Sequence, residues 1–161
     1  MPYSYRVFCR DSAVPSLSEL LVWMRQFESP LVVVGGRSAG DLLSTFWEEV
    51  HVTYESAEAP LTVRCFRADA RGMARLREER DDFVEDLEDL APSSARGLVL
   101  DHLNNSQAVA IVEFAADGVS FAAQEAARGI TMLFVNKAAG LAQRDGVGFF
   151  DEDDDVILKL G

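Results

Sequence analysis

The chain has 161 residues, 48% of them apolar, and a formal net charge of −12 at pH 7. This length and apolar content predict one globular domain over residues 1–161 and exclude an intrinsically disordered protein. The negative charge argues against binding to nucleic acids or to anionic membranes, because both are recognised through lysine and arginine.

The N-terminal segment lacks the basic and apolar regions of a secretion signal. No apolar run approaches the ~20 residues that a membrane-spanning helix needs. We therefore expect a cytoplasmic protein whose two cysteines are reduced and packed in the core.

Alternating apolar and polar residues predict strands in the first half of the chain. The expected strands lie at residues 3–9, 30–34, 49–55 and 61–68, the second short and buried and the last two joined as a hairpin. Ser16 and Glu19 have the spacing of a capping box, which predicts a helix from there to about Phe27. The same spacing from Ser38 predicts a brief helical turn through residues 42–46.

Helical periodicity dominates the middle of the chain. Apolar residues three and four apart predict helices over residues 71–90 and 93–103, and the apolar run at residues 108–114 predicts a central strand covered on both faces. Residues 120–144 keep helical spacing throughout, which predicts one long helix. The alternative is helix, turn and strand, because residues 130–135 have the composition of a strand.

Two further strands are expected around the acidic turn at residues 151–155. The resulting order mixes hairpins with crossover helices. It predicts an α+β domain with a mixed, largely antiparallel sheet and with helices packed mainly on one face. A strictly alternating, doubly wound fold is the alternative.

Sequence motifs of catalysis and cofactor binding are missing. The glycine-rich segment at residues 35–41 lacks the lysine of a phosphate-binding loop, and the acidic turn lacks the glycine and the final glutamate of a calcium loop. Cys9 and Cys65 fall on apolar strand faces, and His102 lies at a helix end, where interaction with the terminal carbonyls is the expected role. We therefore expect no catalytic residue, cofactor or metal site, and a binding role rather than an enzymatic one.

Acidic residues gather in two segments. One predicted helix carries eight carboxylates and one arginine between Glu78 and Asp89, and residues 151–155 are all acidic. Both segments would attract a basic protein partner, although a solvated helix face is the simpler interpretation. The candidate partner-binding residues are Glu78, Glu79, Asp82, Glu85, Asp86, Asp89, Asp151, Asp153 and Asp155.

Basic side chains lie on the polar side of the predicted sheet. Arg6, His51 and Arg64 are expected on one face, where they would bind a carboxylate or a phosphate. The alternative is that the arginines cover the sheet with their aliphatic stems and pair with the acidic helix.

Two hypotheses follow from these patterns. The first is a small acidic interaction domain, such as an inhibitor, an immunity-type protein or a regulatory protein, that acts through its acidic surface. The second is an anion-binding or small-molecule-binding domain, or an enzyme, that uses Arg6, His51 and Arg64. Charge clustering and the missing motifs favour the first. The sequence leaves the partner, any ligand and the oligomeric state open.

Overall fold

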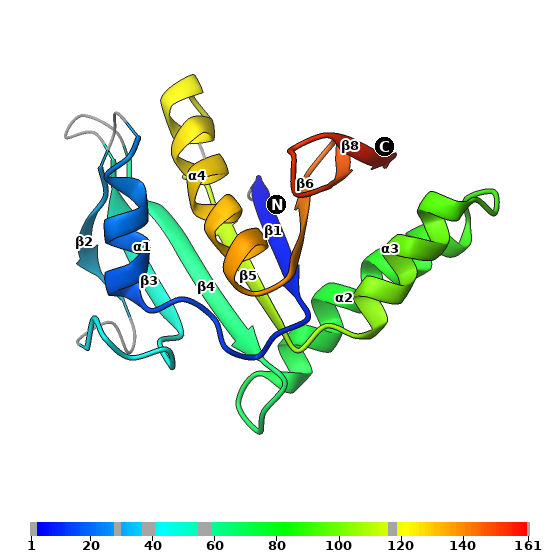
Figure 1. Cartoon of the computed structure of the whole chain (residues 1–161), viewed down its shortest axis with the longest axis horizontal. Helices are drawn as coiled ribbons and strands as arrows, with labels where there is room; N and C mark the ends of the chain where they lie inside the picture. Colours follow the sequence, from blue (N-terminus) through cyan, green and yellow to red (C-terminus); the bar gives the residue numbers. More distant parts are fainter. Residues whose placement is uncertain (1–2, 28–29, 37–40, 55–58, 116–118, 161) are drawn as a thin grey trace.

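The computed structural model describes residues 3–27, 30–36, 41–54, 59–115 and 119–160. Within them, eight strands form one sheet in the spatial order β2-β3-β4-β5-β1-β6-β7-β8 (Figure 1). The strands are β1 (Ser4–Cys9), β2 (Val32–Gly35), β3 (Glu49–Thr53), β4 (Leu61–Arg67), β5 (Ala108–Glu113), β6 (Gly140–Arg144), β7 (Gly148–Phe150) and β8 (Val156–Lys159). The helices are α1 (Leu17–Met24), α2 (Met73–Glu88), α3 (Ser94–Asn104) and α4 (Phe121–Lys137).

The predicted α+β class is confirmed, and two of its details are revised. Every described strand pairing is antiparallel, so the sheet is not mixed. The helices cover both faces rather than mainly one. Helices α1 and α4 pack on the first face, whereas α2 and α3 lie side by side on the second (Figure 1).

Alternation along the strands explains the two apolar layers. In β1, Val7 and Cys9 belong to the core under α1 and α4, while Phe8 belongs to the core under α2 and α3. Strand β5 is buried on both sides, as its continuous apolar run predicts. The second layer needs a helix pair of its own, because Phe8 and the apolar residues of β5 would otherwise face water.

Phe83 anchors α2 to the second face. Its ring centroid lies 5.8 Å from that of Phe8 and 5.6 Å from that of Phe149 of β7, both in edge-to-face geometry. Helix α2 also buries Leu76 and Leu87 and leaves its charged residues outside. These few apolar residues are therefore sufficient to pack a strongly acidic helix against the sheet.

Residues 130–135, whose sequence allows either a helix or a strand, are helical in the structure. Helix α4 continues through residues 130–135 and ends at Lys137, so the predicted helix is confirmed there, but its extension to residue 144 is wrong because β6 begins at Gly140. Ala139 has a φ of 49°, and a Cβ on Gly140 would lie 2.3 Å from a methyl carbon of Val7. The chain reverses at this point because only glycine allows so close an approach to β1.

Two local predictions in the first half are also corrected. Strand β2 is an edge strand with Val32 and Val34 exposed, not a buried one. Residues 42–46 form no helix but one hydrogen-bonded turn, in which the amide of Ser44 donates to the carbonyl of Asp41 at 3.2 Å and the amide of Leu43 donates to the Asp41 carboxylate. Leu43 and Phe46 are exposed. Ser38 and residues 56–58 of the predicted hairpin link at residues 56–60 lie outside the described residues.

The predicted helix starts agree with the structure. Ser16 caps α1 by accepting a hydrogen bond from the amide of Glu19, and Ser93 caps α3 in the same way. No helix among the described residues is both long enough and apolar enough to span a membrane.

Candidate functional site

Helix α2 places most of its acidic residues outward because its buried side is fixed by the sheet. Asp69 accepts hydrogen bonds from the amides of Arg71 and Gly72 and so fixes the turn before the helix, although no side chain caps the helix itself. Three of the acids beyond are paired with arginines of the same helix: Glu78 and Glu79 with Arg75, and Asp81 with Arg80.

The remaining acids of this segment are Asp82, Glu85, Asp86, Glu88 and Asp89, and we call them the acidic face of α2. All five are exposed, and none forms an ion pair within the described part of the chain. Asp82, Glu85, Asp86 and Asp89 follow the i, i+3, i+4, i+7 spacing of one helix stripe. The structure therefore brings most of the predicted acidic helix residues onto one surface.

Glu78 and Glu79 differ from that surface. Glu79 turns inward and lies under the helix, where its side chain is 13% exposed and bonds to Arg6 of β1. Glu78 is exposed but lies 3.7 Å from Arg75. Neither carboxylate belongs to the unpaired stripe.

The acidic turn at residues 151–155 is partly structural. The carboxylate of Asp151 accepts hydrogen bonds from the amides of Asp153 and Asp155. Asp154 has a φ of 66° and pairs with Arg144 of β6 and, at 2.7 Å, with Arg128 of α4. Glu152, Asp153 and Asp155 point outward.

The acidic turn lies beside α3 and α4. The turn lines a cleft with Leu98 and His102 of α3 and with Val135 of α4. No hydrogen bond or ion pair joins the turn to α2 within the residues that the structure describes. Those residues also contain no group of three or more histidine, cysteine or carboxylate side chains placed to hold a metal ion.

The three predicted basic residues share the second face of the sheet, as alternation predicts. Arg6 on β1 and Arg64 on β4 both lie opposite Ile111 of β5, and His51 lies opposite Thr62 on β4. The face is not positive, however, because carboxylates from four segments converge on it. Those carboxylates are Glu49, Glu79, Glu113 and Asp145.

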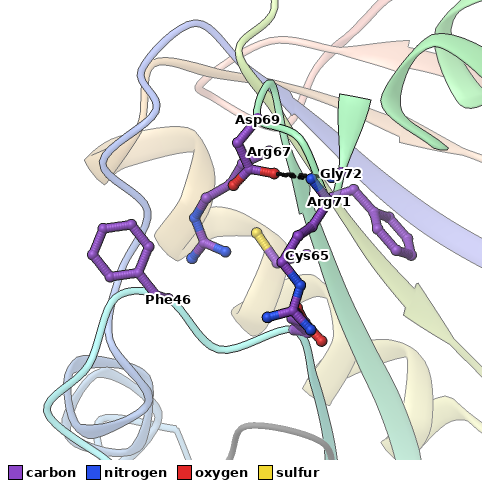
Figure 2. Close-up of a pocket in the computed structure, with 8 residues that line it drawn as sticks. Phe46, Cys65, Arg67, Asp69, Arg71 and Gly72 are labelled. Atoms are coloured by element: carbon purple, nitrogen blue, oxygen red, sulfur yellow. Dashed lines mark hydrogen bonds and ion pairs between the residues drawn. The ribbon is translucent and has the colours of Figure 1, made fainter. Parts of the chain in front are cut away.

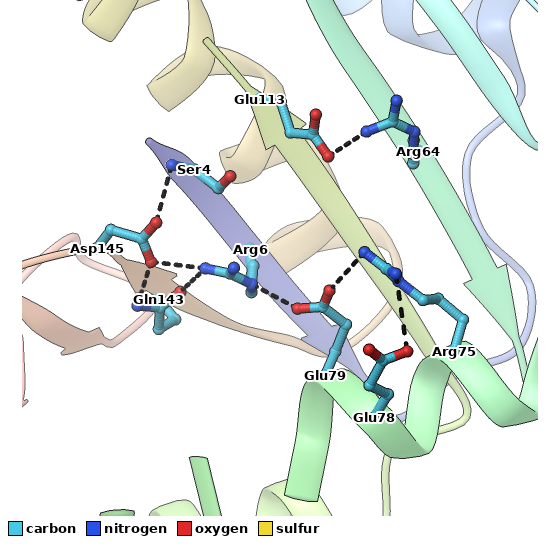
Figure 3. Close-up of polar contacts among 9 residues, drawn as sticks. All are labelled: Ser4, Arg6, Arg64, Arg75, Glu78, Glu79, Glu113, Gln143 and Asp145. Atoms are coloured by element: carbon cyan, nitrogen blue, oxygen red, sulfur yellow. Dashed lines mark hydrogen bonds and ion pairs between the residues drawn. The ribbon is translucent and has the colours of Figure 1, made fainter. Parts of the chain in front are cut away.

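Arg6 is the most enclosed of the three. Its guanidinium donates to Glu79 at 2.8 Å, to Asp145 at 2.6 Å and to Gln143 at 3.0 Å, and the side chain is 14% exposed (Figure 3). Burial lowers the pKa of Arg6, but hydrogen bonds and attraction from Glu79 and Asp145 outweigh it, so the net pKa is raised. Arg6 is therefore a fixed structural cation whose Nε and Nη1 donors are already used.

Arg64 and His51 are also occupied. Arg64 donates to Glu49 at 2.8 Å and to Glu113 on β5, and Nδ1 of His51 lies 3.0 Å from the hydroxyl of Thr62. Periodicity could place these basic residues on one face, but it could not reveal their acidic partners, because Glu79 and Asp145 are distant in sequence from Arg6.

The candidate nucleophiles and the candidate acid–base residue have structural roles. Burial raises the pKa of the Cys9 thiol, and burial raises that of Cys65 to about 11, so both stay protonated at neutral pH. His102 donates from Nε2 to the carbonyl of Phe8 at 2.7 Å and accepts at Nδ1 from Arg10 at 3.3 Å. Burial lowers the pKa of His102, which keeps it neutral and tied to β1 rather than to its own helix end.

No protein-family model, no curated protein and no solved structure matches this chain.

Proposed function

We propose that this protein is an acidic interaction domain that binds a basic protein partner through the acidic face of α2. The observation that carries the proposal is the contrast between two sets of charges. The arginines of the second sheet face are neutralised within the molecule, whereas five neighbouring carboxylates on α2 are exposed and unpaired.

Unpaired like charges on one helix repel one another and weaken the helix by a few tenths of a kcal/mol per close pair (~0.2–0.5). A basic partner removes that repulsion and supplies charge-assisted hydrogen bonds to the carboxylates. The negative electrostatic field of these carboxylates also accelerates diffusional encounter with a positive surface, most strongly at low ionic strength.

The second hypothesis, anion binding at Arg6, His51 and Arg64, has weaker support. An anion at Arg6 would lie beside Glu79 and Asp145, and one at Arg64 would lie beside Glu49 and Glu113. Repulsion between these carboxylates and the anion is electrostatically unfavourable. The acidic face of α2 presents no such repulsion to a basic partner.

The test compares two variants that remove the same number of charges. One neutralises the acidic face by D82N, E85Q, D86N, E88Q and D89N. The control neutralises five exposed acids elsewhere, by D11N, E19Q, E152Q, D153N and D155N. Each protein is immobilised and used to capture partners from a lysate in about 50 mM and about 150 mM salt.

We expect the wild-type protein and the control to retain the same salt-sensitive partners, and the acidic-face variant to lose them. Retention of every partner by the acidic-face variant contradicts the proposal. Equal loss from both variants also contradicts it, because total charge rather than this helix would then decide binding.

A further inference from the structure

A cavity of about 290 Å³ lies where β4 ends and α2 begins, away from the acidic face of α2. Three segments enclose it: the loop before β3, the end of β4 and the turn that leads into α2 (Figure 2). The turn approaches β4 so closely that a Cβ on Gly72 would lie 2.4 Å from the carbonyl oxygen of Arg67. Close packing of these segments thus gives the cavity a fixed wall.

Arg67 forms the buried part of that wall. The residue is 8% exposed, and its guanidinium donates to the carbonyl of Trp47 at 3.1 Å and to the carbonyl of Thr45. The ring of Phe46 lies over the guanidinium, with its centroid at 5.5 Å. Two backbone carbonyls and an aromatic ring orient the cation but leave its charge uncompensated.

The charge of Arg67 differs from that of the other arginines of the sheet. The other strongly enclosed arginines of the sheet, Arg6 and Arg144, each pair with at least one carboxylate, whereas Arg67 forms no ion pair with any described carboxylate. A buried charge is costly unless an opposite charge is close. The site therefore favours an anion that comes from outside the described chain.

The acids that line the cavity are already engaged. Glu48 pairs at 2.8 Å with Arg71, and Asp69 accepts from the amides of Arg71 and Gly72. Arg71 itself is on the exposed rim, where its long side chain can turn toward a second anion. Phe46 stands at the mouth with 74% of its surface exposed, so an apolar body in the cavity would cover it.

We infer that this cavity binds a small organic anion: a carboxylate or a phosphate held by Arg67, on an apolar or aromatic body that packs against Phe46. The guanidinium has donors beyond the two used on backbone carbonyls, and its planar fork matches both oxyanions. This site is independent of the proposed protein-interaction surface, and either can exist without the other.

The test uses three probes of similar shape at constant ionic strength: benzoate, phenyl phosphate and the neutral benzamide. Amide chemical shifts of the ¹⁵N-labelled chain are followed during each titration. We expect saturable changes at residues 45–47 and 65–72 with one or both anions, and not with benzamide. The anion that binds with the higher affinity shows whether the cavity prefers a carboxylate or a phosphate. Equal effects of benzamide, or changes scattered over the surface, overturn the inference.

Two variants separate binding from folding. R67K keeps the charge but loses the planar fork, and we expect it to weaken the bound anion about tenfold or more. R77Q removes an exposed arginine of α2 that forms no described ion pair and should leave affinity unchanged. Unaltered affinity in R67K overturns the inference. If R67K does not fold, the inference is judged only by whether the chemical-shift changes of the wild-type protein map to residues 45–47 and 65–72.

Discussion

Arg6 illustrates how single residues set the charge of this molecule. Its guanidinium lies between Glu79 on α2 and Asp145 after β6, so three distant segments share one ion-pair network. The network attaches α2 to the sheet on its polar side, next to the apolar contacts of Phe83. A residue predicted as a possible ligand contact is, in the structure, a link between a helix and a sheet.

Replacement of Arg6 by glutamine (R6Q) should lower the free energy of unfolding by about 2 kcal/mol. Glu79 and Asp145 would keep their charges in a partly buried place without a counter-ion, and breaking such a pair from one side costs more than the pair contributes. Urea denaturation measures the loss. The control R77Q should change stability by less than about 0.5 kcal/mol, and an equally small effect of R6Q would show that the network is not stabilising.

His102 should make stability depend on pH. Its folded pKa lies below the ordinary value of 6.5 because of burial, so the unfolded chain binds the proton more readily. The contribution of neutral His102 is therefore fully present above about pH 7.5 and is lost progressively as the pH falls through about 6.5 toward the folded pKa.

The variant H102Q keeps a donor for Phe8 and an acceptor for Arg10 but does not titrate. Between about pH 7.5 and about pH 5.5, urea denaturation should show a larger loss of stability in the wild-type protein than in H102Q. Identical pH profiles would mean that His102 is not the titrating group.

At the scale of elements, replacing two different glycines by alanine should change stability in opposite directions. Gly97 is exposed within α3 and an added Cβ would meet nothing within 4 Å, so G97A should stabilise the protein by about 0.5–1 kcal/mol through helix propensity. Gly148 in β7 has a φ of 142°, and an added Cβ would lie 2.1 Å from the carbonyl oxygen of Leu158, so G148A should cost at least about 2 kcal/mol. Thermal unfolding measures both; a destabilised G97A or a neutral G148A contradicts the packing described for that element.

The elements also show what periodicity can and cannot predict. Long segments with a clear repeat, such as α2, α4 and β1, were predictable because the buried side of each imposes its period on the sequence. Residues 138–144 were not, since the helical spacing continues by chance beyond the point where Gly140 must pass Val7. The exposed position of β2 depends on which strand lies beside it, and local composition does not encode that neighbour.

The candidate site, like the fold, was predictable only where a local repeat determines which side a residue faces. The stripe on α2 follows from helical spacing alone, because Asp82, Glu85 and Asp89 lie on one side whatever the helix packs against. The pairing of Arg6 and the buried, unpaired state of Arg67 depend on segments that are distant in sequence. Tertiary contacts therefore decide which charges remain available to a partner.

For the whole molecule, the central feature is an uneven distribution of charge. The net charge is −12, yet most carboxylates on the sheet and the two at the base of the acidic turn are neutralised or hydrogen-bonded within the fold. Among the described residues, the acidic face of α2 gathers five exposed and unpaired carboxylates, whereas the acidic turn exposes three, Glu152, Asp153 and Asp155. This difference is why we propose α2 as the side that meets a positive partner.

The most direct test is a titration of the ¹⁵N-labelled protein with a short peptide rich in arginine and lysine, followed by amide chemical shifts at low ionic strength. We expect the largest changes to map to residues 82–89 and to disappear in the variant with the five acidic-face residues neutralised. Changes centred on residues 151–155, or spread evenly over all exposed acids, would contradict it.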